Sequence, residues 1–188
     1  MNNKIKLFLD MDSCIIDSVT AYCNAYNEIH RFNANFIPAD PSKNEHWDFR
    51  IQCPLEKNPT KIFGHPMFFQ LVKFMPNAEN IIKELCEKRQ VIICSLGTYH
   101  NISNKALWIK YNMPYIKDAI LLTNQGIKMD KGIVNMGYEG SVFIDDVKSN
   151  LDSSNAERKI LFGKRFSWNS EFTGEWCKDW TEVGEKLL

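Results

Sequence analysis

Two pairs of carboxylates and one serine each follow a short apolar run of the sequence. In chain order they are Asp10 and Asp12, Ser95, and Asp145 and Asp146. Short, continuous apolar runs are typical of strands in a parallel sheet that is covered on both faces. Ligands of such sheets bind at the carboxyl ends of the strands, so we expect these five side chains to lie together.

Four carboxylates at one edge of a sheet repel one another unless a cation lies between them. Oxygen ligands with a high negative charge suit Mg²⁺, which completes its shell with water and substrate phosphate. Any one of these carboxylates could instead be a turn residue at the end of a strand. Two pairs on separate strands favour a site, so the sequence predicts magnesium bound by Asp10, Asp12, Asp145 and Asp146.

The rest of the chain predicts the elements that position these residues. Further strands are expected at 119–122 and 159–162, and helices at 17–31, 67–74, from Pro76 onward, 101–112 and 180–188. Strands that alternate with helices imply an α/β fold with a parallel sheet and helices on both faces. The stretch from 32 to 65 is rich in proline and asparagine, which predicts an irregular insertion with short helices.

Three stretches around these residues resemble motifs of the haloacid dehalogenase (HAD) superfamily of phosphatases. KIKLFLDMD, which ends at Asp12, resembles the first motif, and VIICS, which ends at Ser95, resembles the second. SVFIDD, which ends at Asp146, resembles the fourth, and Asn150 stands at the spacing of its trailing position. Each fragment is weak alone, but their order along the chain makes the resemblance specific.

The resemblance implies a HAD-like, Rossmann-like parallel sheet flanked by helices. It divides the chain into a phosphatase core of residues 1–16 and 76–188 and a small, mainly helical cap of residues 17–75, inserted after the first strand.

The resemblance also implies roles for the acidic residues. Asp10 attacks phosphorus and forms an aspartyl-phosphate, while Asp12 protonates the leaving alkoxide and then activates water. Mg²⁺ is bound by Asp10, the main-chain carbonyl of Asp12 and Asp146, with Asp145 as a direct or water-mediated partner.

The third motif of the superfamily is a lysine, which binds the phosphoryl oxygens together with Ser95. Lys105 and Lys131 are both candidates. Lys131 lies between two glycines, so a solvated surface position competes with a role in the site. Lys105 faces the site only if its helix directs the first turn inward.

Within the superfamily, the chain is similar to the 5'(3')-deoxyribonucleotidases. The shared features are DMD followed by Asp17, the Lys-x-x-Trp pattern that begins at Lys105, IDD, and a C-terminal ILF run followed by Asn169, Trp176 and Trp180. Two residues depart from the pattern: Ser13 replaces a usual glycine, and Leu96 replaces a usual hydroxyl residue. The resemblance implies a Mg²⁺-dependent phosphomonoesterase for nucleoside monophosphates.

Aromatic residues in and beside the insertion could stack on a nucleotide base, since every base has an apolar face. Trp47, Phe49 and Phe69 are the candidates. Phe69 lies in an apolar run at helical spacing, so a place in the core is the competing interpretation.

The composition of the chain limits the kinds of binding partner that we expect. Lys plus Arg and Asp plus Glu number 23 each, so no duplex nucleic acid or membrane is expected as the main partner. The start of the chain does not resemble a signal peptide. The six cysteines are scattered without a CxxC pair, which favours reduced thiols and a cytoplasmic protein. A homodimer is compatible with these features.

Two other functions stay open. One is a HAD phosphatase for another small phosphate ester, such as a sugar phosphate. The other is a catalytically silent module that binds a nucleotide or a protein, although such a module has no need of the second acid, Asp12.

Overall fold

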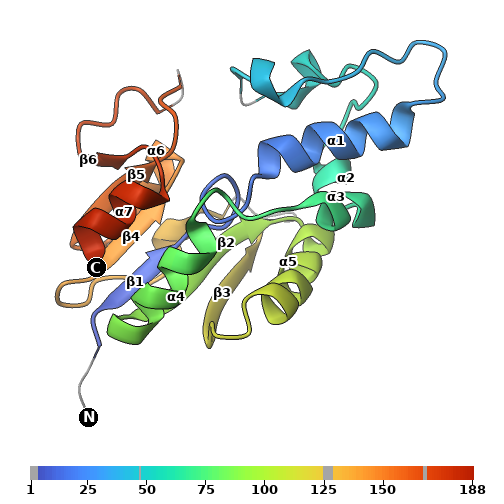
Figure 1. Ribbon diagram of the computed structural model, residues 1–188. Helices are drawn as coiled ribbons and strands as arrows, with labels where there is room; N and C mark the ends of the chain where they lie inside the picture. The colour runs from blue at the N-terminus through green and yellow to red at the C-terminus, as the bar shows by residue number, and fades with distance from the viewer. Residues whose placement is uncertain (1–3, 47, 125–128, 167–168) are drawn as a thin grey trace.

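The computed structural model describes residues 4–46, 48–124, 129–166 and 169–188. At the centre of this described part, six parallel strands form a sheet in the order β3-β2-β1-β4-β5-β6 (Figure 1). The strands are β1 (Lys6–Leu9), β2 (Gln90–Gly97), β3 (Asp118–Thr123), β4 (Val142–Asp145), β5 (Arg158–Phe162) and β6 (Glu175–Cys177). The α/β prediction with a HAD-like parallel sheet is confirmed.

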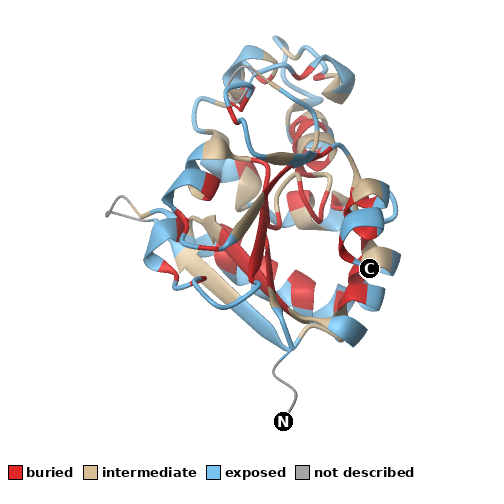
Figure 2. Ribbon diagram, turned by 90° about the vertical axis from the view of Figure 1, so that its left-hand side faces the viewer, coloured by how far each residue is buried: buried red, intermediate tan, exposed pale blue. Residues whose placement is uncertain are grey.

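Helices cover both faces of the sheet. They are α1 (Ser18–His30), α2 (Pro59–Phe63), α3 (Pro66–Leu71), α4 (Ala78–Lys88), α5 (Tyr99–Asn112), α6 (Lys148–Ser153) and α7 (Trp180–Leu187), with 3₁₀ turns at Pro41–Lys43, Phe49–Ile51 and Lys131–Ile133. Leu7 and Leu9 of β1 share one buried cluster with residues of α4, α5 and α7. Phe8, which points to the opposite face, lies in a second cluster with Leu151 of α6. Figure 2 shows that the central strands are buried, whereas the edge strand β3 and the outer sides of the helices are partly or fully exposed.

The element boundaries differ from the predicted ones in a few places. Strand β2 continues through Ser95 to Gly97, because β3 pairs with it along that length. The helix expected from Pro76 begins at Ala78, and the helix expected at 67–74 ends at Leu71. Two short elements were missed, namely β6 and α6, because three or six residues carry too little periodicity to stand out.

The inserted segment, residues 17–75, lies above the carboxyl ends of the strands (Figure 1). Polar side chains begin its short helices: Asp48 accepts a hydrogen bond from the backbone N–H of Arg50, and Asn58 from that of Thr60. Such caps satisfy backbone donors in the proline-rich part that follows α1, where only short helices form. Aromatic rings hold the segment together, since Phe63 packs on Tyr22 and Phe49 with centroids 4.8 and 5.5 Å apart.

The loop that follows β1 is fixed at two points. Trp180 is fully buried, and its indole N–H donates to the carbonyl of Cys14 over 2.7 Å. Ser13 has a φ of 55°, in the left-handed region where a glycine carries no steric cost. Its hydroxyl lies 2.9 Å from that of Ser18 at the start of α1. The serine that replaces the usual glycine therefore keeps the glycine-like backbone and gains a hydroxyl contact.

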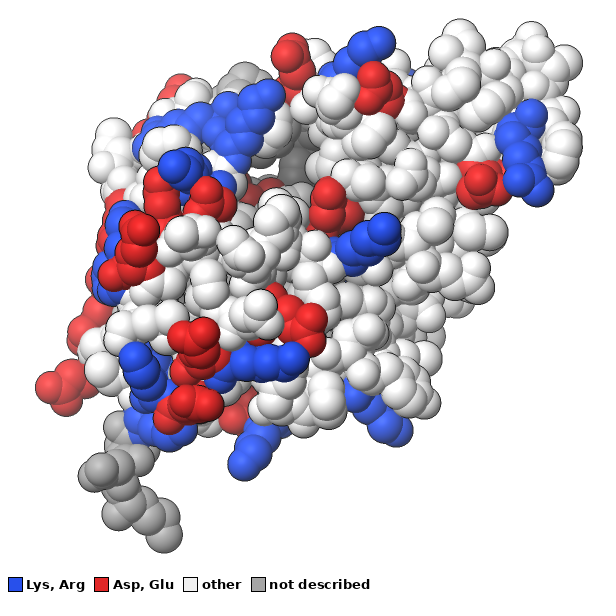
Figure 3. All heavy atoms as spheres, viewed as in Figure 1, with Lys and Arg blue, Asp and Glu red and all other residues white. Residues whose placement is uncertain are grey.

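Basic and acidic side chains are interspersed on the face of the molecule shown in Figure 3. A hollow opens in the upper part of this face, between the side of the molecule that holds β5 and β6 and the side that holds α1. Basic side chains lie on one rim of the hollow and acidic ones at its base. The described residues include no helix long and apolar enough to cross a membrane.

Candidate active site

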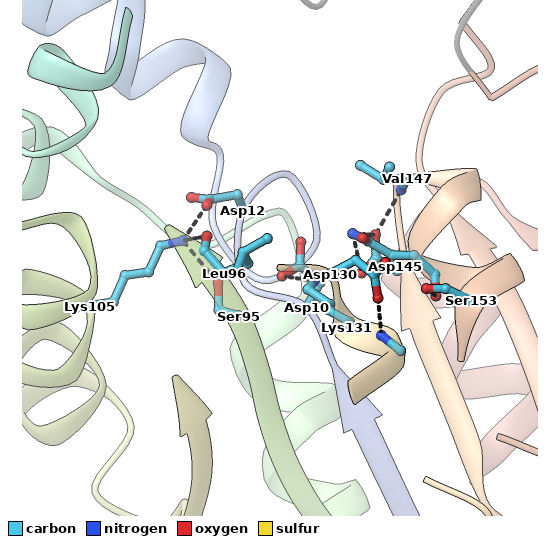
Figure 4. Close-up of polar contacts among 12 residues, drawn as sticks. Asp10, Asp12, Ser95, Leu96, Lys105, Asp130, Lys131, Asp145, Val147 and Ser153 are labelled. Atoms are coloured by element: carbon cyan, nitrogen blue, oxygen red, sulfur yellow. Dashed lines mark hydrogen bonds and ion pairs between the residues drawn. The ribbon is translucent and has the colours of Figure 1, made fainter. Parts of the chain in front are cut away.

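Asp10 directly follows β1 and forms an ion pair with Lys131. The Lys131 ammonium lies 2.5 Å from Asp10 Oδ1 and 2.6 Å from Asp145 Oδ2, and the lysine is 1% exposed (Figure 4). Lys131 begins a 3₁₀ turn whose cap, Asp130, accepts from the backbone N–H of Gly132. Lys131 is therefore buried at the site and does not occupy a solvated surface position, which was the competing interpretation of the sequence.

A second lysine holds the other acid of the first motif. Lys105 extends from α5, and its ammonium donates to Asp12 Oδ2 and, over 2.9 Å, to the hydroxyl of Ser95 (Figure 4). Lys105 is fully buried, whereas the Asp12 side chain is 26% exposed. The sequence presented the two lysines as alternatives for one role. The structure places them at different carboxylates, on opposite sides of the site.

Both carboxylate oxygens of Asp145 accept hydrogen bonds from groups of the protein. One oxygen accepts from Lys131, the other accepts from the Val147 backbone N–H over 2.8 Å, and the Asn150 amide donates to both oxygens over 3.1 Å. Burial raises the pKa of Asp145 to about 6, and Lys131 opposes that rise. These contacts suit a residue that orients Lys131 better than a direct metal ligand.

Asp146 has a different environment. It is 9% exposed, and its carboxylate has no hydrogen-bond donor among the described residues. Burial raises the pKa of Asp146 well above its usual range, and repulsion by Asp145 and Asp10 raises it further. Ligand atoms of Asp10, Cys14 and Asp146 all lie within 4.8 Å of one another. Cys14 was not predicted in the site; its place four residues after Asp10 was the available signal.

A cavity of about 760 Å³ opens above these residues. Its floor includes Asp10, Asp12, Lys131 and Asp146, and its upper wall comes from the inserted segment. The sequence did not single out several of its lining residues, which are Asn44, Arg50, Phe63, Asn101 and Lys164. The cavity is large enough for a ligand with a phosphate at the floor and an organic group at the wall.

The three aromatic candidates have different positions. Phe49 lines the cavity, and its ring packs against that of Tyr22 at a tilt of 32°, with centroids 4.1 Å apart. Phe69 is not among the described lining residues and packs edge-on against Phe68, with centroids 5.0 Å apart. Its helical spacing is therefore that of a packing residue. Trp47 lies outside the described residues.

Comparison with known protein families shows which family the chain belongs to. A family model described as "5' nucleotidase, deoxy (Pyrimidine), cytosolic type C protein" matches residues 3–188. The chain belongs to this family. The predicted resemblance to the deoxyribonucleotidases is confirmed. Members of this class of protein are phosphoric monoester hydrolases, which is the general activity that the match supports.

Solved structures agree with the fold of this nucleotidase-family protein. A haloacid dehalogenase-like hydrolase from Streptococcus pneumoniae superimposes with a TM-score of 0.67 at 13% identity, with 100% of each chain covered. A HAD-superfamily hydrolase from Geobacter sulfurreducens has a TM-score of 0.62 at 11% identity, covering 100% of this chain and 99% of the other. A HAD hydrolase from Bacillus subtilis, whose structure is bound to magnesium, has a TM-score of 0.63 at 11% identity, with 99% of each chain covered. No curated protein sequence matches the chain.

The residues of this family member fit a divalent cation. Four carboxylates and two ammonium groups meet at the cavity floor, which leaves two negative charges uncompensated at neutral pH when all are ionised. Asp146 lacks a donor, and Asp12 Oδ1 is buried without a hydrogen-bond partner in the described part of the chain. Hard oxygen donors with this charge suit Mg²⁺. Asp10 and Asp146, whose ligand atoms lie within 4.8 Å of each other, are the side chains that would hold it.

We expect Mg²⁺ to stabilise the nucleotidase fold through Asp146. A ligand that binds only the native state adds RT ln(1 + [L]/Kd) to the free energy of unfolding, about 2.7 kcal/mol at a hundredfold excess over Kd. The melting temperature of the wild type should therefore rise with Mg²⁺, and that of Asp146→Asn should not. Without metal, Asp146→Asn should melt no lower than the wild type, because the substitution removes a buried carboxylate that repels its neighbours.

Asp152→Asn is the matched control, because Asp152 is an exposed carboxylate on nearby α6 that pairs with Lys148. It should keep the full response to Mg²⁺. An equal rise in the melting temperature of Asp146→Asn would contradict the assignment of Asp146 as a ligand.

Proposed function

We propose that the protein hydrolyses nucleoside monophosphates in a Mg²⁺-dependent reaction, with Asp10 as the nucleophile. The observation that carries the proposal is the pairing of each acid of the first motif with its own buried lysine, at the floor of a cavity with an aromatic wall. A nucleoside monophosphate has the matching chemistry, since it joins an anionic phosphate to a flat base.

In the proposed reaction, a carboxylate oxygen of Asp10 attacks phosphorus while the ester oxygen leaves. Lys131 and the backbone hold Asp10 in place, because Asp10 N–H donates to the carbonyl of Ile144 over 2.9 Å. Lys131 also lowers the negative charge that an incoming phosphate meets. A bound Mg²⁺ would supply Lewis-acid stabilisation of the phosphoryl oxygens.

Asp12 is the proposed general acid and base. Burial raises the pKa of Asp12, and the nearby Lys105 opposes that rise. The raised pKa favours the protonated form that donates to the leaving alkoxide, and the resulting carboxylate then accepts a proton from the attacking water. Lys105 and Ser95 are the proposed partners of the phosphoryl oxygens.

Residues 17–75 are proposed to act as a cap that covers the phosphatase core of residues 1–16 and 76–188. A closed cap keeps water away from the phosphoenzyme and contributes the wall against which the base packs. The cytosolic location and the homodimer also stay predictions, the former in keeping with the description of the family.

The proposal is tested by phosphate release from ribo- and deoxyribonucleoside monophosphates and from sugar phosphates, with and without Mg²⁺. Phe49→Leu should raise KM for nucleotides about tenfold, since stacking on a base contributes roughly 1–3 kcal/mol. Phe69→Leu is the matched control because Phe69 lies outside the cavity lining, and it should leave KM near the wild-type value.

The outcome separates the remaining candidates. Turnover of sugar phosphates alone would replace the nucleotide by another small phosphate ester and remove the stacking wall. Folded protein that releases no phosphate from any substrate would favour the silent binding module.

A further inference from the structure

We propose that Asn101 is a positioning residue that holds the aromatic wall of the cap in register with the catalytic floor. The inference rests on the proposed nucleotidase function. It concerns the seam between the start of α5, which belongs to the sheet side of the molecule, and the junction of α2 and α3 in the inserted segment.

Asn101 makes a polar side-chain contact across this seam. Its amide nitrogen donates to the main-chain carbonyl of Phe63 over 2.8 Å, although the two residues are 38 positions apart in sequence. Asn101 is 3% exposed and lines the cavity, as does Phe63. The bonded carbonyl belongs to the residue whose ring packs on both Tyr22 and Phe49, so the amide fixes the backbone behind the aromatic wall.

The other end of the same amide packs against the end of β2, on the catalytic side of the seam. Asn101 Oδ1 lies so close to Gly97 that a Cβ there would approach it to 2.1 Å. Gly97 ends β2, the strand that carries Ser95, and the Asn101 backbone N–H is capped by Thr98. The absence of a side chain at residue 97 therefore makes room for the amide between the strand end and the cap.

Asn101 and Lys105 are one turn apart on α5 and lie on the same side of the helix. Lys105 reaches Asp12 and Ser95, whereas Asn101 reaches the cap. One rigid turn of helix thus fixes the distance between the proposed phosphate partners and the proposed base wall. A nucleotide must span this distance, but a phosphate ester without a base does not.

The consequence is a specific dependence on substrate. Loss of the Asn101 amide should let the wall move relative to the floor, and a misplacement of about 1 Å can cost about a hundredfold in rate. We expect Asn101→Leu, which has a similar size and no donor, to lower kcat/KM for nucleotides about 10- to 100-fold. The loss for glycerol phosphate, which has no base, should be at least about fivefold smaller.

Asn104→Leu provides the matched control. Asn104 also bonds across the seam, donating to the carbonyl of Gly64 over 3.2 Å, but it does not line the cavity. This variant should keep the ratio of nucleotide to glycerol phosphate turnover within about twofold of the wild type. The melting temperatures of both variants show how much stability each loses when its hydrogen bond across the seam is removed. If Asn101→Leu does not fold, Asn101→Ala takes its place.

The experiment measures kcat and KM separately for a nucleoside monophosphate and for glycerol phosphate, in the wild type and both variants. A selective loss for the nucleotide in Asn101→Leu supports the inference. Equal losses for both substrates, or the same selective loss in Asn104→Leu, would overturn it. A wild type with no preference for nucleotides would refute the proposed substrate and the inference with it, whereas a wild-type preference that Asn101→Leu leaves intact would refute the inference alone.

Discussion

Replacement of Asp10 by asparagine should lower kcat by at least about 10⁴-fold, because an amide cannot act as the nucleophile. Asp10 is the carboxylate at the end of the central strand, it is 6% exposed, and its partner Lys131 holds one oxygen. The near-isosteric amide keeps the shape of the site, so the loss should appear in kcat more than in KM.

The measurement is steady-state phosphate release, together with acid-quenched wild-type enzyme analysed by mass spectrometry for a phosphoryl group on Asp10. Asp118→Asn makes the same chemical change at an exposed position at the start of β3 and should keep wild-type activity. If Asp10→Asn retained more than about a tenth of wild-type kcat, the nucleophile would lie elsewhere.

The second large effect concerns Lys131. Replacement by methionine keeps much of the aliphatic volume but leaves Asp10 and Asp145 buried without their shared cation. Removal of one partner of a buried ion pair costs about 3–5 kcal/mol of the free energy of unfolding. We expect that loss in urea denaturation at pH 7, together with loss of phosphatase activity.

Lys105→Met is the matched comparison. Lys105 pairs with one carboxylate, that of Asp12, whereas Lys131 pairs with two buried carboxylates, those of Asp10 and Asp145. The loss of stability should therefore be smaller for Lys105→Met than for Lys131→Met, and a larger loss would contradict the stated roles.

The cost at Lys131 should also depend on pH. The pKa of Asp145 is raised from 3.8 to about 6 in the folded protein, so its protonation favours the folded state and this contribution is lost as pH rises through about 6. Without Lys131, which lowers that pKa, the loss should be greater. The difference between wild type and Lys131→Met should therefore shrink between pH 7 and pH 5.

The sequence by itself was sufficient for the parallel sheet and the placement of Asp10, Asp12 and Asp146. Asp10 and Asp146 directly follow short apolar strands, Asp12 lies two residues after Asp10, and parallel strands end at one edge of the sheet. Short-range patterns therefore determined which acids meet. They also predicted the irregular stretch from 32 to 65, whose prolines exclude long regular elements.

The partners of these acids were decided only by the tertiary structure. Lys105 and Asp12 are 93 positions apart, and the direction of the lysine depends on how α5 packs against β2 and β3. Lys131 lies in a short turn that has no periodic signal of its own.

Helical spacing was also unable to separate Phe49, which lines the cavity, from Phe69, which packs beside Phe68. Asn101 gave no sequence signal because its partner is a main-chain carbonyl, which any residue at position 63 would supply. Contacts of this kind depend on the three-dimensional arrangement of distant segments, which local propensity and periodicity do not encode.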